Sequence, residues 1–311
     1  SQGQIVALVN YMNQILLALV ALANLIVAVT RALACAIRIN EVFRVNSSMK
    51  EGAEEKNTQE SGKPRVVFDH VTFTYGGAQE ASLTDISFSA MSGETVGIIG
   101  GTGSGKSTLV NLIPRFYDAT KGSVTVDGQD VKAYTFRHLR EKIGVVPQKA
   151  VLFLGTIRSN LLWRKKDAKE SELWKALQIA QAEEVVKKKQ KGLDEKVETG
   201  GRNFSGGQRQ RLTIARALVG GPDILILDDS ASALDFATDA ALRRSIKENT
   251  KKATVFLVSQ RAATVKNADQ ILVLDDGKLV GKGTHEELFK TCNVYKEICM
   301  SQFSSQEVAQ L

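Results

Sequence analysis

The 311-residue chain carries a formal net charge of +7, and 43% of its residues are hydrophobic and 24% charged. This balance excludes a disordered or low-complexity protein and is sufficient for one or two ordinary cores. Its lysines are dispersed apart from one run at 187–191, and its three cysteines are widely spaced. We therefore expect no nucleic-acid partner, no disulfide framework and no cysteine metal site.

The N-terminal segment is strongly apolar. Residues 5–37 are mostly Leu, Val, Ala and Ile, with no charge before Arg31. A helix of this length crosses the roughly 30 Å hydrocarbon core of a bilayer. The polar residues Asn10, Asn24, Arg31 and Arg38 keep a spacing of seven or its multiple, so their stripe faces either other helices or a wet cavity. No basic region precedes the apolar run and the first residue is not Met, so we expect a piece or processed form of a longer protein.

Polarity changes twice further along the chain. Residues 46–64 are polar and charged, so they cannot bury a core and are expected to form a connector. Apolar and polar residues then alternate over 65–75 and 86–89, as in half-buried strands, and continuous apolar runs follow. Buried strands that alternate with helices favour a parallel α/β core with an antiparallel β layer attached. The buried runs lie at 95–99, 224–227 and 254–258, and the expected helices include 172–182 and 208–219.

A glycine-rich run between a buried strand and a helix is the strongest motif. Such a run lets backbone N–H groups surround phosphate oxygens, and the helix N-terminus adds a positive dipole end. Lys106 would neutralise the β and γ phosphates of a nucleotide, and Ser107 would place its hydroxyl on Mg²⁺. An incidental glycine turn is the plain alternative, which the strand and helix context disfavours. This P-loop is Gly100, Gly101, Thr102, Gly103, Ser104, Gly105, Lys106, Ser107 and Thr108.

Two further features would complete a nucleotide site. Asp228 ends the apolar run 224–227, where its carboxylate would hold Mg²⁺ through water, although a helix cap is the plain alternative. A turn of small residues also precedes the helix expected at 208–219, which makes a second anion site in principle. This turn, the signature motif, is Phe204, Ser205, Gly206, Gly207 and Gln208.

The signature motif resembles the Leu-Ser-Gly-Gly-Gln sequence of the ATP-binding cassette (ABC) family. The resemblance assigns Tyr75 to stacking on adenine, Gln148 to the Q-loop that also meets Mg²⁺, and Asp235 to the D-loop (Ser232-Ala233-Leu234-Asp235). Taken singly, these residues suit strand packing, a turn and a helix cap. Their order along the chain matches that of the family's motifs, which chance rarely produces.

The resemblance covers nearly the whole chain and implies its organisation. A membrane helix fused in front of a cassette is similar to ABC exporters. It implies a P-loop NTPase core of mostly parallel sheet, an antiparallel β subdomain and a helical subdomain that carries the signature motif. ATP and Mg²⁺ are the implied ligands, and the full protein would be a multi-pass cell-membrane protein with its cassette in the cytoplasm. The expected parts are the last transmembrane helix and its cytoplasmic extension (1–45), a linker (46–64), the cassette (65–301) and a polar tail (302–311).

Two positions depart from the family pattern. Asp229 stands where the family has the Glu that polarises the attacking water. A carboxylate shortened by one methylene is retracted by roughly 1 Å, and misplacement on that scale can lower the rate about 10²-fold. Gln260 stands where the family has His, and an amide can donate a hydrogen bond but cannot exchange a proton near neutral pH. Both changes affect hydrolysis rather than binding.

These departures imply a division of labour between two chains. In the family, ATP lies between one cassette's P-loop and the partner's signature motif, so Ser205, Gly206, Gly207 and Gln208 would act on the partner's nucleotide. The chain therefore resembles the degenerate-site half of a heterodimeric bacterial multidrug exporter. Its implied partners are a second, different half-transporter, the lipid bilayer and an exported substrate. The alternatives are a regulatory nucleotide-binding subunit without turnover and an active homodimeric exporter.

Overall fold

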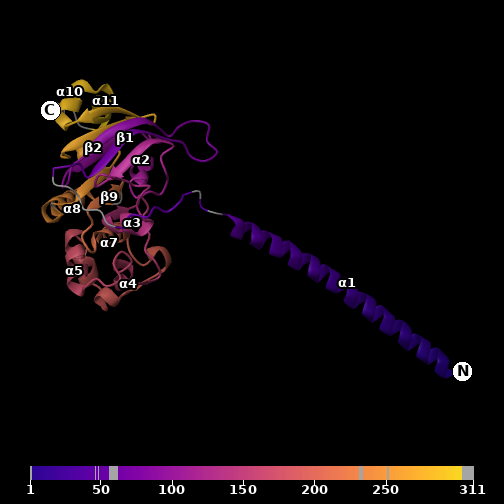
Figure 1. Ribbon diagram of the computed structural model, residues 1–311. Coiled ribbons are helices and arrows are strands. Elements are labelled where there is room, and N and C mark those ends of the chain that lie inside the picture. The colour runs from indigo at the N-terminus through magenta and orange to yellow at the C-terminus, as the bar shows by residue number, and fades with distance from the viewer. Residues whose placement is uncertain are drawn as a thin grey trace. The chain divides into compact units, whose positions relative to one another are not determined.

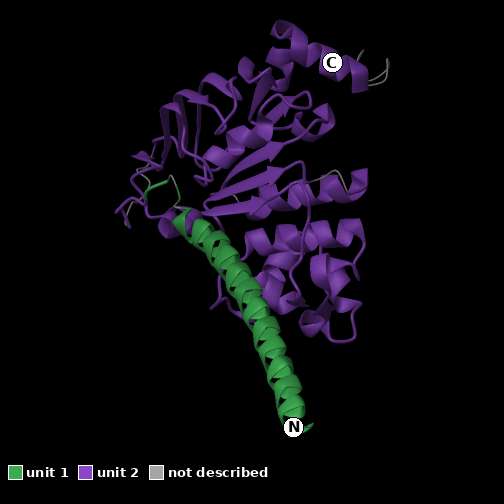
Figure 2. Cartoon of the chain, turned by 90° about the vertical axis from the view of Figure 1, so that its right-hand side faces the viewer, with its two compact units in different colours: residues 1–50 green, residues 51–311 purple. Residues whose placement is uncertain are grey.

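The computed structural model describes residues 2–45, 47, 49–55, 62–230, 234–250 and 252–302. The chain divides into two compact units, Ser1–Lys50 and Glu51–Leu311, which Figure 2 shows in different colours. Each unit is described by itself below. The second unit, which contains all the motifs, is called the cassette.

The first unit consists of one long helix, α1 (Gln2–Arg44), which includes the expected apolar segment and extends beyond it at both ends. Its most apolar 18-residue window has a mean hydropathy of 2.3, and its side chains are exposed throughout. Of the helices in the described part of the chain, it is the one long and apolar enough to span a membrane. At 1.5 Å per residue its 43 residues extend about 65 Å, roughly twice the hydrocarbon thickness of a bilayer.

A six-stranded sheet forms the centre of the cassette, in the order β12-β11-β3-β10-β9-β6. Its strands pair in parallel except for β11 and β12, which are antiparallel. Val258 pairs with both Ile98 and Asp228, so three strands end together at one edge of the sheet. The strands are β3 (Thr95–Gly100), β6 (Ile143–Val146), β9 (Ile224–Asp228), β10 (Thr254–Val258), β11 (Gln270–Asp275) and β12 (Lys278–Gly283).

An antiparallel sheet in the order β2-β1-β4-β5 packs on one face of the central sheet. Its strands alternate buried and exposed residues, as the sequence pattern predicts for a sheet with one solvated face. Phe88 stacks on Phe68 at 4.6 Å between ring centroids and meets Phe256 of β10 edge-on at 6.4 Å, which joins the two sheets. The strands are β1 (Val66–Phe73), β2 (Leu83–Ala90), β4 (Lys121–Val126) and β5 (Gln129–Asp130).

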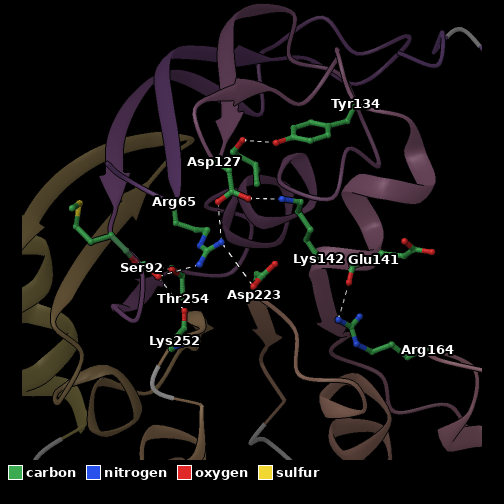
Figure 3. Close-up of polar contacts among 12 residues, drawn as sticks. Arg65, Ser92, Asp127, Tyr134, Glu141, Lys142, Arg164, Asp223, Lys252 and Thr254 are labelled. Atoms are coloured by element: carbon green, nitrogen blue, oxygen red, sulfur yellow. Dashed lines mark hydrogen bonds and ion pairs between the residues drawn. The ribbon is translucent and has the colours of Figure 1, made fainter. Parts of the chain in front are cut away.

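Buried charges fasten the antiparallel sheet to the rest of the cassette (Figure 3). The Asp127 carboxylate, with its side chain fully buried, accepts hydrogen bonds from Arg65 Nη1 at 2.9 Å and Lys142 Nζ at 2.7 Å. The same Arg65 nitrogen lies 3.9 Å from Asp223 Oδ1, just before β9. These four residues, the ion cluster, therefore connect the start of β1, the end of β4, the end of helix α3 (Phe136–Lys142) and the entry to β9.

The rest of the regular structure in the described part of the cassette consists of helices and one short sheet. Figure 1 shows α4 and α5 at the end of the cassette opposite α10 and α11. Around α4, α5 and α7 one apolar cluster forms the core of a helical subdomain, and a short sheet of β7 (Gly155–Thr156) and β8 (Lys196–Val197) borders it. The α-helices are α2 (Lys106–Leu112), α3 (Phe136–Lys142), α4 (Ile157–Leu161), α5 (Glu170–Ile179), α6 (Glu183–Lys187), α7 (Gly206–Leu218), α8 (Phe236–Asn249), α9 (Ala262–Val265), α10 (His285–Thr291) and α11 (Asn293–Gln302).

Part of the polar stretch expected to be a linker, residues 52–54, pairs with the backbone of the cassette. Gly52 N–H donates to the Tyr134 carbonyl at 3.1 Å, and Glu54 N–H donates to the Ala133 carbonyl at 2.9 Å. A Cβ atom at position 52 would lie 2.1 Å from the Ala133 carbonyl oxygen, so this close pairing requires glycine. Backbone pairing needs no apolar side chains, which explains why a polar stretch docks here.

Candidate nucleotide site

The P-loop connects β3 to α2 through glycines with left-handed backbone. Gly103 and Gly105 have φ values of +82° and +92°. A Cβ atom at Gly105 would lie 2.8 Å from both the Ser82 carbonyl oxygen and a Leu83 methyl carbon. Only glycine combines this conformation with this proximity, so the loop can wrap tightly before α2 begins at Lys106.

Lys106 lies inside the loop that precedes it. Its ammonium group donates to the carbonyl oxygens of Gly100 at 2.9 Å and Gly101 at 2.5 Å, and Ser104 Oγ lies 3.4 Å away. Burial lowers the pKa of Lys106, while the charges of Asp229 and Asp228 act in the opposite direction. The loop thus holds a cation at the position where a phosphate would need one.

Two oxygen ligands meet beside Lys106. Ser107 Oγ donates to Asp228 Oδ1 at 3.0 Å. Burial raises the pKa of Asp228, and the Ser107 hydrogen bond opposes this effect. The described residues contain no group of three or more His, Cys, Asp or Glu side chains that could hold a metal. Mg²⁺ prefers oxygen ligands and is commonly bound by one or two protein groups together with phosphates and water, so this pair suits it.

Asp229 takes a strained position next to Asp228. Its φ of +44° is left-handed, a conformation that Asp adopts more readily than most other non-glycine residues. Its N–H donates to the Val258 carbonyl at 3.0 Å, and its Oδ2 accepts from Gln148 Nε2 at 3.2 Å. The carboxylate is thus held by the residue that the family resemblance assigns to the Q-loop.

These side chains line one cavity of about 340 Å³. Gln260 borders it from the loop after β10, and Tyr75 borders it from the end of the antiparallel sheet. The Tyr75 hydroxyl forms a 3.0 Å hydrogen bond with Thr108 Oγ1, which fixes the ring. Ser82 and Val258 also line the cavity, and nothing in their sequence context predicts it. The lining residues are Tyr75, Ser82, Thr102, Gly103, Gly105, Lys106, Ser107, Thr108, Gln148, Asp228, Asp229, Val258 and Gln260.

The signature motif does not contribute to this cavity. Ser205 is the N-cap of α7: its Oγ accepts from Gln208 N–H at 3.3 Å, while Gln208 Oε1 accepts from Ser205 N–H at 3.1 Å. This reciprocal capping box explains why the helix begins at Gly206, before the start at 208 that the sequence pattern predicts. Ser205 and Gly206 are exposed, and Phe204 is buried in the core of the helical subdomain.

Asp235 also lies away from the cavity, as the N-cap of α8. Its Oδ1 accepts from Thr238 N–H and its Oδ2 from the Thr238 hydroxyl, both at 2.8 Å. These two bonds lower the pKa of Asp235. The structure therefore shows the capping role, while Ser232 and Ala233 of the expected D-loop lie outside the described residues, as do residues 303–311 of the expected tail.

Known proteins resemble this chain over most of its length. Residues 83–232 match the family model described as ABC transporter. The chain is 42% identical to the uncharacterized ABC transporter ATP-binding protein YfiB of Bacillus subtilis, over 97% of this chain and 52% of YfiB. It is 38% identical to the probable multidrug resistance ABC transporter ATP-binding/permease protein YheI of the same species, over 95% of this chain and 50% of YheI.

A solved structure of a bacterial Atm1-family ABC exporter with ATP bound superimposes with a TM-score of 0.77 and 34% sequence identity. The match covers 86% of this chain and 47% of the exporter chain. The expected fold, an α/β cassette of mixed sheets preceded by a long apolar helix, is thereby confirmed. The chain spans about half the length of the relatives that it matches.

Proposed function

The chain contains an ABC transporter ATP-binding domain with exporter-type homologues, and we propose that the chain is part of one half of an ABC exporter. Its own site binds Mg-ATP and hydrolyses it slowly, and its signature motif serves the site of a partner half-transporter. The observation that carries the proposal is the single cavity in which Lys106, Ser107 and Asp228 meet Asp229 and Gln260.

Binding is the part of the function for which this cavity is fully equipped. Lys106 provides a positive charge, the glycines open the backbone toward phosphate oxygens, and Tyr75 offers an aromatic face for the base. Ser107 and Asp228, already 3.0 Å apart, would hold Mg²⁺, whose charge would offset that of the phosphates. ATP and Mg²⁺ are therefore the proposed ligands.

Hydrolysis needs a group that positions and polarises water. The residues at the two positions that serve this purpose in the family are less suited to it here. The Asp229 carboxylate is one methylene shorter than the glutamate of the family pattern and is hydrogen-bonded by Gln148 at 3.2 Å. Gln260 can donate an amide N–H to a γ-phosphate oxygen but cannot accept and release a proton near pH 7. Both features permit binding while they slow the attack of water.

The signature motif suits action on a second chain. Its exposed Ser205 and Gly206 stand at the N-terminus of α7, a 13-residue helix whose first N–H groups carry a partial positive charge. None of these residues lines the chain's own cavity. We propose that they contact the nucleotide of a partner half-transporter, with Asp235 close to the same interface.

The helix α1 would place the complex in a membrane, with the cassette in the cytoplasm. Its apolar part is long enough to cross a bilayer, and its roughly 65 Å length leaves a further part to extend outside. The whole protein would then be multi-pass. YheI, whose name assigns it to multidrug resistance, supports export of drug-like molecules.

Measuring nucleotide binding and ATP turnover on the same sample tests the proposal. The chain should bind a fluorescent ATP analogue in a Mg²⁺-dependent manner, and Lys106→Ala should weaken this binding by roughly 10- to 100-fold because charge-assisted hydrogen bonds are lost. Turnover should lie about 10²-fold below the usual enzyme median of about 10 s⁻¹. Lys278→Ala, which changes an exposed lysine on β12, is the matched control. If Lys106→Ala left the nucleotide affinity unchanged, the proposed site would be wrong.

A further inference from the structure

The last helix of the described chain contacts the loop that carries Gln260. Gln302, at the end of α11, accepts from Ala262 N–H through its Oε1 at 2.8 Å. Its Nε2 donates to the Gln260 carbonyl oxygen, also at 2.8 Å. One side-chain amide therefore bridges the backbone on both sides of Arg261, a position that periodicity and motif spacing do not reveal.

The helix that carries Gln302 is firmly anchored. Tyr295 and Cys299 of α11 are fully buried in an apolar cluster that includes residues of α9, α10 and β11. The Tyr295 hydroxyl also shares a 2.7 Å hydrogen bond with His285 Nδ1 at the start of α10. The end of α11 is thus held relative to the central sheet, so its side-chain amide can act as a fixed support.

The loop of residues 259–262, the switch loop, is held by hydrogen bonds from the central sheet, from within the loop and from α11. Ser259 N–H donates to the Ile98 carbonyl at 3.0 Å, and Arg261 N–H donates to Ser259 Oγ at 3.0 Å. The hydrogen bonds from the Gln302 side chain hold the loop from α11. Between these supports, Gln260 borders the cavity that contains Lys106.

We infer that Gln302 is a positioning residue, which holds the switch loop so that the Gln260 amide faces the γ-phosphate of bound ATP. The inference rests on the proposed function, because it assumes that Mg-ATP occupies the cavity. Its consequence is that the C-terminal helix belongs to the part of the cassette that distinguishes ATP from ADP. ATP has a γ-phosphate and ADP does not. Loss of the Gln302 hydrogen bonds should therefore weaken the binding of ATP more than the binding of ADP.

The experiment compares the affinities of the full 311-residue chain for Mg-ATP and Mg-ADP. Gln302→Ala should weaken Mg-ATP binding by roughly 3- to 10-fold and Mg-ADP binding by less than about twofold, as expected for lost hydrogen bonds that act on the γ-phosphate alone. Gln302→Met, which keeps the length and packing of the side chain without its hydrogen bonds, should give the same selective loss. In a Gln260→Ala background, Gln302→Ala should have an effect below about twofold.

Glu297→Ala is the matched control, since Glu297 is exposed on the same helix. Wild-type nucleotide selectivity in Gln302→Met would overturn the inference, and so would equal losses for ATP and ADP in both Gln302 variants. Lys106→Ala separates this failure from failure of the proposed function. If Lys106→Ala weakens binding while both Gln302 variants keep wild-type selectivity, only the inference fails. If Lys106→Ala has no effect, the nucleotide site itself is wrong.

Discussion

The Ser107 hydroxyl donates a 3.0 Å hydrogen bond to the carboxylate of Asp228, although 121 residues separate the two in the chain. The contact forms because β3, β10 and β9 are neighbours and end at the same edge of the central sheet. The fold therefore brings together two oxygen groups of a kind suited to Mg²⁺. Asp228 is at the same time a partly buried carboxylate, and no cationic side chain among the described residues forms an ion pair with it.

This arrangement predicts that Asp228→Asn stabilises the nucleotide-free chain at neutral pH. Burial raises the pKa of Asp228 above its ordinary 3.8, so the folded state favours the protonated form. Its stabilising contribution is complete below pH 3.8 and is lost as the pH rises through the folded pKa. Thermal unfolding should show a higher midpoint for Asp228→Asn at pH 7, and the difference should shrink on acidification.

The matched control for that substitution is Asp275→Asn, at the exposed end of β11 in the same central sheet. It should leave the midpoint unchanged. Asp228→Asn should also lose most of the additional stabilisation that Mg²⁺ gives in the presence of ATP, because one of the two protein ligands is weakened. A lower midpoint for Asp228→Asn at neutral pH would contradict the assignment of burial as the dominant influence on Asp228.

The ion cluster predicts a large loss of stability when Asp127 is removed. Asp127→Ala leaves Arg65 and Lys142 as buried charges without their carboxylate, which typically costs about 3–5 kcal/mol. Urea unfolding followed by tryptophan fluorescence measures this loss. Glu141→Ala, which breaks the exposed pair with Arg137, is the control and should change stability by less than about 1 kcal/mol. Similar effects of the two substitutions would show that the ion cluster does not fasten the antiparallel sheet.

Periodicity predicted the parts of the fold whose environment is uniform along an element. The fully buried strand β10 is mostly apolar, and apolar and polar residues alternate in the half-buried strand β1. The sequence pattern of each strand therefore indicates how deeply it is buried. The glycine-rich loop before α2 was equally recognisable, because Gly103 and Gly105 adopt left-handed backbone that favours glycine. Both kinds of signal are local in the sequence.

Features that depend on distant partners were not predictable in this way. The docking of Gly52 and Glu54 beside Tyr134 uses backbone hydrogen bonds, which no side-chain pattern records. The Gln302 contact joins a helix end to a loop 42 residues away, and a single glutamine carries no periodic signal. The burial of Asp127 was likewise hidden, because a lone aspartate in a polar turn looks exposed until its cations are located.

The proposed division of labour predicts unequal effects of two substitutions in the assembled transporter. Ser205→Arg should reduce the total ATPase activity of the pair by roughly 10²- to 10³-fold, because the partner's working site loses a preorganised donor near the transferring phosphoryl group. Lys106→Ala should reduce it less, since it affects the slow site. Ser171→Arg, on the exposed first turn of α5, is the control. Equal losses, or a larger loss from Lys106→Ala, would show that this chain's own site is the working one.

The ATPase rate of the double variant Asp229→Glu with Gln260→His tests the central claim most directly. A longer carboxylate and a titratable imidazole should raise turnover by roughly 10- to 100-fold, since misplacement by about 1 Å costs a factor of that size. The gain should vanish when Lys106→Ala is added, and Mg-ATP affinity and the unfolding midpoint should be followed, because the left-handed backbone at Asp229 suits Asp better than Glu. A double variant that folds and binds Mg-ATP like the wild type but hydrolyses no faster would contradict the claim that these two residues limit hydrolysis.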